Sequence, residues 1–156
     1  MIYVKDLIEV CNGKLLCGDI NLPLNNFSKD TRLINKDDVY IGIKGESFDG
    51  NKFYKDALDK GASVCILDNI DEVDDKYKDK TIVKVEDTIK AIGLLAKYKR
   101  SLYNIPVVAV TGSVGKTSTK DMIAAVLSTE YKVLKTEANY NNHIGLPLTI
   151  LKLTDE

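Results

Sequence analysis

Short apolar runs alternate with amphipathic segments in the part of the chain up to residue 104. The apolar runs have the length of strands and lie at residues 14–17, 39–43, 62–67 and 81–85. The amphipathic segments carry apolar side chains at helical spacing and lie at residues 4–10, 52–60 and 88–103. Residues 27–32 fit neither pattern. Strands that alternate with helices predict a small α/β domain that ends near residue 104.

The run at residues 39–43 has the clearest strand pattern. Apolar side chains at its odd positions alternate with a tyrosine, a glycine and then a lysine at the even positions. This alternation is typical of a strand that buries one face and exposes the other. Residues 44–51 follow and are rich in turn-forming types. We therefore expect a half-buried strand that leads into an exposed loop.

A second pattern begins after the helix predicted at residues 88–103. Pro106 disfavours helical geometry in the residue before it, so the helix should end here and a domain boundary should follow residue 104. The β-branched run at residues 107–110 is typical of a strand buried on both faces of a parallel sheet. Residues 122–127 have helical periodicity, and residues 132–136 fit a second strand. This order predicts the first β-α-β portion of another domain.

A glycine loop lies between that strand and that helix. It reads Thr111, Gly112, Ser113, Val114, Gly115, Lys116 and Thr117, with Ser118 next. The glycines let the backbone approach a phosphate closely, and the loop N–H groups and the positive end of the helix then attract the anion. Lys116 supplies the catalytic cation for the β- and γ-phosphates of ATP, and Thr117 supplies a hydroxyl for Mg²⁺. These residues form the candidate ATP site.

The glycine loop also has a simpler interpretation. The full P-loop pattern has a glycine at the position of Val110, and a glycine turn between a strand and a surface helix would leave Lys116 merely solvated. The Gly-Lys-Thr sequence directly after a β-branched strand favours phosphate binding. Residues 105–156 are too few for a complete α/β sheet, so we expect a truncated P-loop ATPase domain and a chain that is a fragment.

Composition excludes several function classes. The chain has 156 residues, of which 44% are hydrophobic and 29% charged, as in a soluble protein that buries a core. Its formal net charge of -1 gives no support for a nucleic-acid partner. We expect no signal peptide and no membrane insertion, because charged residues interrupt every apolar stretch. The expected location is cytoplasmic.

The cysteines and the histidine form no metal-binding pattern. Cys11, Cys17 and Cys65 are an odd number without Cys-x-x-Cys spacing, and His143 is the sole histidine. This pattern fits neither a disulfide framework nor a zinc site. We expect reduced cysteines in the core. For His143, a hydrogen bond to the backbone within a loop is favoured over a catalytic role.

Several motifs together resemble the Mur ligases, the ATP-dependent peptide ligases of peptidoglycan synthesis. They are Asp30-Thr31-Arg32, the loop from Gly45 to Phe53, the glycine loop, and the segment from Asn141 to Pro147. Their order and separations also fit, so the resemblance covers essentially the whole chain. Asn51 stands where the family often has histidine, and Val114 stands where it often has asparagine.

The resemblance implies an ATP-dependent amide ligase with ATP and Mg²⁺ as cofactors. Two segments are most similar to the members that join D-alanyl-D-alanine to UDP-N-acetylmuramoyl-tripeptide through an acyl phosphate. They are residues 48–50 and residues 111–113 followed by Lys120. Residues 1–104 would bind the UDP-sugar-peptide, and residues 105–156 would begin the central ATPase domain. The rest of the parent chain would be missing, so these residues alone would be inactive.

The resemblance also implies the substrate-binding residues. They are Asp30, Thr31, Arg32, Lys44, Gly45, Glu46, Phe48, Asp49, Gly50 and Asn51. Asp30 and Arg32 fit a structural ion pair at a turn equally well, and the loop could be an ordinary surface connection. Asn142, together with Asn139 and Asn141, is a candidate for contacts with ATP or Mg²⁺, or for a polar turn that caps the next helix.

Three other functions remain open. The first is the family member that adds the third amino acid of the peptide. The second is a P-loop kinase or GTPase of another lineage, although the guanine-reading motif Asn-Lys-x-Asp does not occur in the sequence. The third is a UDP-sugar-binding module without catalytic activity, in which replacement of Lys116 would leave ligand binding unchanged.

Overall fold

The computed structural model describes residues 1–137 and 142–154. Its strands are β1 (Lys14–Cys17), β2 (Phe27–Ser28), β3 (Val39–Ile41), β4 (Val64–Leu67) and β5 (Thr81–Lys84). Its α-helices are α1 (Val4–Cys11), α2 (Tyr54–Asp59), α3 (Thr88–Ser101), α4 (Lys116–Leu127) and α5 (Gly145–Ile150). Short 3₁₀ turns are η1 (Thr31–Leu33), η2 (Gly50–Phe53) and η3 (Asp75–Tyr77). Every element predicted before residue 104 is present, with ends that differ by a few residues.

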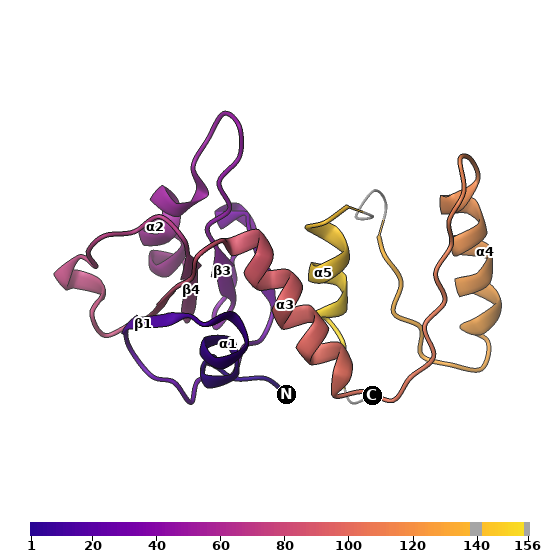
Figure 1. Ribbon diagram of the computed structural model, residues 1–156, viewed down its shortest axis with the longest axis horizontal. Helices are drawn as coiled ribbons and strands as arrows, with labels where there is room; N and C mark the ends of the chain where they lie inside the picture. Colours follow the sequence, from indigo (N-terminus) through magenta and orange to yellow (C-terminus); the bar gives the residue numbers. More distant parts are fainter. Residues whose placement is uncertain (138–141, 155–156) are drawn as a thin grey trace.

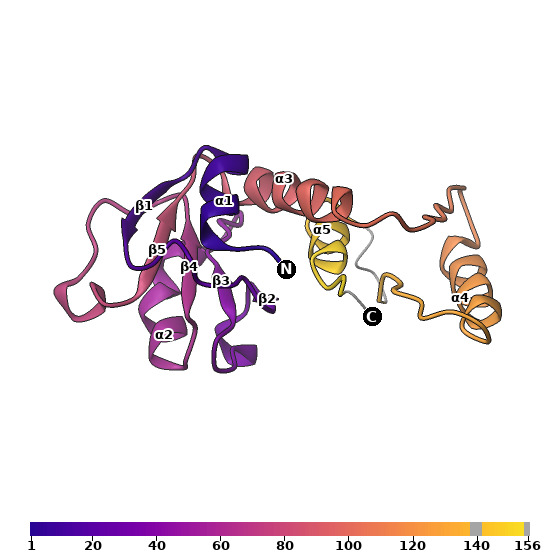
Figure 2. The same ribbon diagram turned by 90° about the horizontal axis from the view of Figure 1, so that it is seen from below.

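The N-terminal part has three layers, in which helices cover both faces of one sheet (Figures 1 and 2). The sheet has five strands in the order β1-β5-β4-β3-β2. Strands β2, β3, β4 and β5 run parallel, while β1 is antiparallel to β5 at one edge. A mostly parallel sheet with helices on both faces is the α/β fold expected from the sequence.

The strand β3 is buried on both faces, so the prediction of a half-buried strand is wrong. Val39, Tyr40 and Ile41 are each at most 1% exposed. The strand lies inside the sheet, and its neighbours in the layers cover the tyrosine face as well as the aliphatic face. Tyr40 tolerates this burial because its hydroxyl donates a hydrogen bond to the carbonyl oxygen of Gly50 at 2.8 Å.

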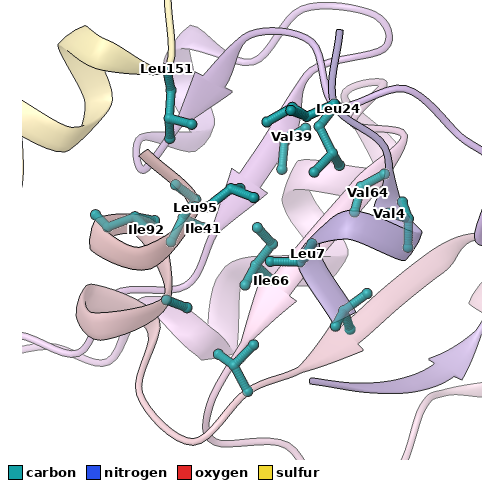
Figure 3. Close-up of a cluster of buried hydrophobic side chains, with 14 of the residues drawn as sticks. Val4, Leu7, Leu24, Val39, Ile41, Val64, Ile66, Ile92, Leu95 and Leu151 are labelled. Atoms are coloured by element: carbon teal, nitrogen blue, oxygen red, sulfur yellow. The ribbon is translucent and has the colours of Figure 1, made fainter. Parts of the chain in front are cut away.

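One face of the sheet packs against α1 and α3 (Figure 2). Figure 3 shows Ile41 and Ile66 of the central strands meeting Leu7 of α1 and Leu95 of α3. These side chains are fully buried. Asp87 caps α3 as predicted, since its carboxylate accepts a hydrogen bond from the N–H of Lys90 at 2.8 Å.

The opposite face packs against α2. Cys65 and Ile82, at alternate positions of their strands, point to this side. They belong to one buried hydrophobic cluster with Ala57 and Leu58 of α2. Apolar residues therefore occupy both sets of alternate positions, as expected for parallel strands between two helical layers. None of the helices in the two described ranges is both long and apolar enough to cross a membrane.

The strands predicted at residues 107–110 and 132–136 do not form. Both segments are described, and neither belongs to a strand. Val107 and Val108 are 67% and 59% exposed. A strand of this kind needs hydrogen-bonding neighbours at its edges and a layer on each face. Within the described residues, the five-stranded sheet uses only strands from the N-terminal part, so these segments remain extended chain that leads to and from α4 (Figure 1).

The helix α5 returns to the N-terminal part and packs on α3 (Figure 1). Leu151, which follows α5, is 2% exposed and belongs to the core formed by α1, α3 and the sheet. The Nζ of the buried Lys99 donates a hydrogen bond to the carbonyl oxygen of Leu151 at 2.6 Å. The end of the tail is therefore held by α3, while α4 lies away from the sheet (Figure 2).

Candidate functional site

The glycine loop turns through two glycines with positive φ angles. Gly112 and Gly115 have φ angles of 151° and 79°, and Gly115 is the left-handed residue that starts α4. No side chain caps this helix start. The N–H groups of the first turn of an α-helix have no partner within the helix, so they are free to bind an anion. The sequence prediction of a loop followed by a helix is confirmed here.

Lys116 is the first residue of α4 and folds back over the loop. Its Nζ donates a hydrogen bond to the carbonyl oxygen of Gly112 at 2.5 Å. The ammonium group therefore lies over the turn that contains Gly112. Val114 is 87% exposed at the tip of the loop. The remaining candidates of the loop, which are Thr111, Ser113, Thr117 and Ser118, are also exposed.

Asn142 caps α5. Its Oδ1 accepts hydrogen bonds from the N–H groups of Ile144 at 3.1 Å and Gly145 at 2.7 Å. This is the polar turn that the sequence offered as the alternative to an ATP contact. Asn139 and Asn141 lie outside the described residues. His143 is exposed in the turn that precedes α5.

A cleft lies at the carboxyl ends of the parallel strands, beside the start of α3. Its volume is about 410 Å³, and it is lined by Lys44, Gly45, Glu46, Asp68, Asp87, Thr88 and Ile89. Clefts at this edge are the usual binding sites of parallel α/β sheets. Three of the predicted substrate-binding residues, Lys44, Gly45 and Glu46, lie in its lining.

The other half of the cleft lining was not predicted from the sequence. Asp68 follows β4, while Asp87 and Thr88 form the start of α3. A signal for them was present, because polar residues that directly follow parallel strands gather at one edge of the sheet. Their nearness to residues 44–46 depends on the strand order, which the sequence did not reveal.

Residues 44–50, here called the binding loop, are tightly fixed to the strand that precedes them. The N–H of Gly50 donates a hydrogen bond to the carbonyl oxygen of Ile43 at 3.0 Å. The N–H of Gly45 donates a hydrogen bond to the carbonyl oxygen of Phe48 at 2.8 Å. A Cβ at Gly50 would lie 2.5 Å from the Ile43 oxygen, so only glycine fits there. Phe48 is 58% exposed, whereas Gly50 is buried.

Asn51 is 2% exposed, and both ends of its amide are hydrogen-bonded within the protein. Its Nδ2 donates to Asp49 and to Asp68, each at 2.8 Å. The hydrogen bonds from Asn51 lower the pKa of the Asp49 carboxyl, with a smaller contribution from Asn69. Asn51 therefore contacts the binding loop and the residues that follow β4.

Asp30 and Arg32 form the ion pair that the sequence offered as one of two roles. Arg32 Nε lies 2.9 Å from Asp30 Oδ1, and Nη2 lies 2.6 Å from Oδ2. Asp30 also caps the η1 turn by accepting from the Arg32 N–H at 2.9 Å. These hydrogen bonds lower the pKa of Asp30 to about 2. The neighbouring Thr31 hydrogen-bonds Asp56 of α2 and lowers the pKa of that carboxyl.

The cysteines take no part in either region. Cys65 is buried, while Cys11 and Cys17 are partly buried, and all three are free thiols. Burial raises the pKa of the Cys11 thiol to about 11 and raises that of Cys65 still further. Such thiols are poor nucleophiles. Within the described residues, no group of acidic, histidine or cysteine side chains could hold a metal ion by itself.

Two family models match the chain. The model described as "Mur ligase family, catalytic domain" matches residues 25–100, and the one described as "Mur ligase middle domain" matches residues 110–156. The first match contains Asp30, Arg32 and the binding loop, and the second contains the glycine loop and α4.

Curated relatives carry two related names. A UDP-N-acetylmuramoyl-tripeptide--D-alanyl-D-alanine ligase of Bacillus subtilis is 39% identical over 97% of this chain and 33% of its own length. The Escherichia coli protein of that name is 38% identical over 99% of this chain and 33% of its own. A UDP-N-acetylmuramoyl-L-alanyl-D-glutamate--2,6-diaminopimelate ligase of Clostridium tetani is 34% identical over 95% of this chain and 29% of its own. The chain spans about a third of the length of these relatives.

Solved structures agree with these matches. A crystal structure of MurF from Acinetobacter baumannii superposes with a TM-score of 0.86 at 30% identity, over 98% of this chain and 33% of that one. The MurF ligase from Thermotoga maritima in complex with ADP has a TM-score of 0.70 at 35% identity, over 81% of this chain and 29% of that one.

Proposed function

The chain belongs to the Mur ligase family, and from that membership we propose that it carries the UDP-sugar-binding region and the ATP loop of a UDP-N-acetylmuramoyl-tripeptide–D-alanyl-D-alanine ligase. The observation that carries the proposal is the glycine loop. Its left-handed Gly115 opens α4, and its lysine lies over the turn. We further propose that residues 1–104 bind the UDP-sugar-peptide and that residues 105–156 begin the ATPase domain.

The proposed reaction joins two substrates through an acyl phosphate. The carboxylate of the UDP-muramoyl-tripeptide attacks the γ-phosphorus of ATP, the bond to the β-phosphate oxygen breaks, and ADP leaves. The amine of D-alanyl-D-alanine then attacks the acyl carbon and displaces phosphate, which forms the amide bond. These are substrates of the cytoplasm, so we propose that location for the protein.

The loop residues of this chain would hold and polarise the nucleotide. The N–H groups at the start of α4 bind phosphate oxygens, and Lys116 stabilises the charge on the phosphoryl group that is transferred. The exposed hydroxyl of Thr117 fits a Mg²⁺ ion held mainly by phosphate oxygens and water, which needs only one or two protein ligands. Such an ion supplies charge neutralisation on the phosphates.

The substrate region is proposed to be the cleft and the turn near it. Lys44, Gly45 and Glu46 of the binding loop line the cleft together with Asp68 and the start of α3. Lys44 is the cation of this lining and is proposed to contact the diphosphate of a UDP-sugar. The carboxylates of Asp68 and Asp87 accept hydrogen bonds from N–H groups at the start of α3. Arg32 is proposed as a further diphosphate ligand.

A second candidate is the ligase that adds the third amino acid. The Clostridium tetani relative carries that name, and it matches this chain over nearly the same residues. Assays of the full-length ligase that contains these residues separate the two candidates. The first candidate requires D-alanyl-D-alanine as the amine substrate, whereas the second requires a diamino acid and a UDP-muramoyl-dipeptide.

The substitution Lys116→Ala tests the ATP loop. In the full-length ligase, we expect phosphate release to fall at least about a hundredfold, because the loop loses its cation for the β- and γ-phosphates. The melting temperature should not change, since the hydrogen bond that the Lys116 side chain makes to Gly112 lies within its own loop. Lys97→Ala is the control, because Lys97 is exposed on α3.

Turnover near that of the unchanged enzyme would contradict the ATP loop. Preference for GTP over ATP in a binding titration would instead favour a P-loop protein of another lineage. Unchanged binding of both ATP and UDP-sugar in the Lys116 variant would favour a module without catalytic activity.

A further inference from the structure

A buried polar network holds the binding loop in place. Asn51 and Thr88 are 2% and 1% exposed, and they come from two different segments that meet at the cleft. Burial of amide and hydroxyl groups is unfavourable unless they are hydrogen-bonded. Every buried side-chain nitrogen and oxygen in the described residues has a partner. The arrangement of those partners is what links the loop to the rest of the cleft.

Asn51 binds on both sides with one amide. Its Nδ2 donates to Oδ1 of Asp49 in the binding loop and to Oδ1 of Asp68 after β4. Its Oδ1 accepts from the backbone N–H groups of Asp68 at 3.0 Å and Asn69 at 3.3 Å. The position therefore requires a donor towards two carboxylates and an acceptor towards two amides, which an asparagine provides.

Asp68 continues the connection to α3. Its Oδ2 accepts from the N–H of Thr88 and lies 3.0 Å from the Thr88 hydroxyl. That hydroxyl also lies 3.2 Å from the carbonyl oxygen of Gly42, beside the binding loop. Asp68 and Thr88 both line the cleft. A single carboxylate thus joins Asn51 to the first turn of α3.

We propose that Asn51 and Asp68, here called the amide–carboxylate clamp, are positioning residues that preform the cleft for the nucleotide-sugar. The proposal rests on the proposed function. Asn51 does not contact the substrate in this role. Instead, the clamp fixes the binding loop against α3, so that Lys44 and the rest of the cleft lining already occupy their binding positions. Preorganisation raises affinity because less conformational freedom is lost when the ligand binds.

The clamp can be broken and partly restored by exchanging its two side chains. Asn51→Asp places a carboxylate against Asp68 at the position of the 2.8 Å hydrogen bond. Asp68→Asn sets two amide donors against each other if its oxygen keeps the contacts with Thr88. In the double variant, the new amide at residue 68 donates to the new carboxylate at residue 51, so this contact is restored in the opposite direction. The contact with Asp49 is not restored, because residue 51 then places a carboxylate against it.

Affinity is the first measurement. UDP and UDP-N-acetylmuramoyl-tripeptide are titrated into the 156-residue chain by calorimetry, with ATP as the second ligand. We expect Asn51→Asp to lower the affinity for both UDP compounds about tenfold to a hundredfold, with little change in the affinity for ATP. The double variant should bind more tightly than Asn51→Asp alone. Asn25→Asp is the control for the added charge, because Asn25 is exposed.

Hydrogen exchange is the second measurement and needs no ligand. The N–H groups of Gly45 and Gly50, which close the binding loop, should exchange faster in Asn51→Asp and more slowly again in the double variant. If the affinity changes caused by the two single substitutions multiply to give the change in the double variant, the two side chains are not coupled. That result would overturn the clamp. An equal loss of affinity for ATP and for the UDP compounds, together with a lower melting temperature, would also overturn the clamp. Asn51 and Asp68 would then have a structural role only.

The two proposals fail in different ways. If the unchanged chain binds neither UDP compound, the proposed function is contradicted, and hydrogen exchange still decides whether the clamp holds the loop. If it binds them and Asn51→Asp leaves the affinity unchanged, the clamp is contradicted and the proposed function stands.

Discussion

Arg32 keeps most of its side chain in solvent while it binds Asp30. The side chain is 83% exposed, and two of its nitrogens contact the carboxylate. A guanidinium has five N–H donors, so this pairing leaves donors for a second anion. A side chain already held by Asp30 also loses less freedom when it binds a phosphate. The structural pair and the diphosphate contact are therefore compatible roles for one residue.

The substitution Arg32→Ala should lower the affinity for the UDP-sugar-peptide more than the affinity for ATP. Loss of one charge-assisted hydrogen bond costs about 1.5–3 kcal/mol, which corresponds to roughly tenfold to a hundredfold in affinity. Calorimetric titration with each ligand measures the difference. Equal weakening of both ligands, with a lower melting temperature, would assign Arg32 to the structural pair alone.

The same variant changes the titration of Asp30. Hydrogen bonds from Arg32 hold the pKa of Asp30 at about 2, so the contribution of the pair to stability is present above the ordinary pKa of an aspartate, about 3.9, and is lost as the pH falls through about 2. In Arg32→Ala, the pKa should rise towards the ordinary value. A carbon-detected NMR titration of the carboxylate measures it, and an unchanged pKa would contradict the pair.

At the scale of elements, α5 and the residue after it pack against the N-terminal part and add to its core. The helix α5 packs on α3 (Figure 1), and Figure 3 shows Leu151 directed towards Ile92 and Leu95 of α3. The sequence predicted a boundary at residue 104, and that division remains a proposal about the whole protein. In this chain, the residues at the end of the tail add to the core that the first part builds.

The substitution Leu151→Ala should lower the free energy of unfolding by about 2–5 kcal/mol, because it opens a cavity in the core. Leu146→Ala is the matched control. Leu146 lies on α5 itself but is 48% exposed, so the same substitution there should cost less than about 1 kcal/mol. Urea denaturation of both variants measures the difference, and equal effects would show that α5 does not dock on α3 in solution.

At the scale of the whole molecule, apolar surface is concentrated in the tail. Large apolar side chains that are at least 59% exposed there include Val107, Val108, Val114, Met122, Val126 and Tyr131. The segment at residues 107–110 is rich in β-branched residues and pairs with no strand within the described residues. The glycine loop is thus formed locally, while the apolar side chains around it remain exposed.

The 156-residue chain should therefore fold but not ligate. Its N-terminal part forms a buried core, whereas within the described residues the proposed ATP site consists of the glycine loop and the start of α4. We expect weak phosphate binding and no turnover with UDP-muramoyl-tripeptide, D-alanyl-D-alanine and Mg-ATP. A ligase assay measures turnover, and light scattering reports whether the exposed apolar surface is covered by a second copy. Turnover by this chain alone would contradict the proposed division of the mechanism.

The sequence by itself determined the local elements and the local chemistry. Apolar periodicity predicted each α-helix before residue 104 and each strand there except β2. Burial of one side of a helix, or of a strand, requires apolar residues at regular spacing, which can be read from the sequence. Asp87 capped its helix as expected, and the glycine loop formed before α4, since both depend on residues close in the chain. The family resemblance was likewise carried by short motifs.

Tertiary structure decided everything that depended on distant neighbours. Tyr40 is buried because α2 covers its face of the sheet, and residues 107–110 are not a strand because they lack partners. Asp68 and Thr88 lie beside the binding loop only through the order of the parallel strands. Asn51 faces Asp68 for the same reason. Residue spacing records which side chains share a face, but strand order and pairing arise from contacts between segments far apart in the chain.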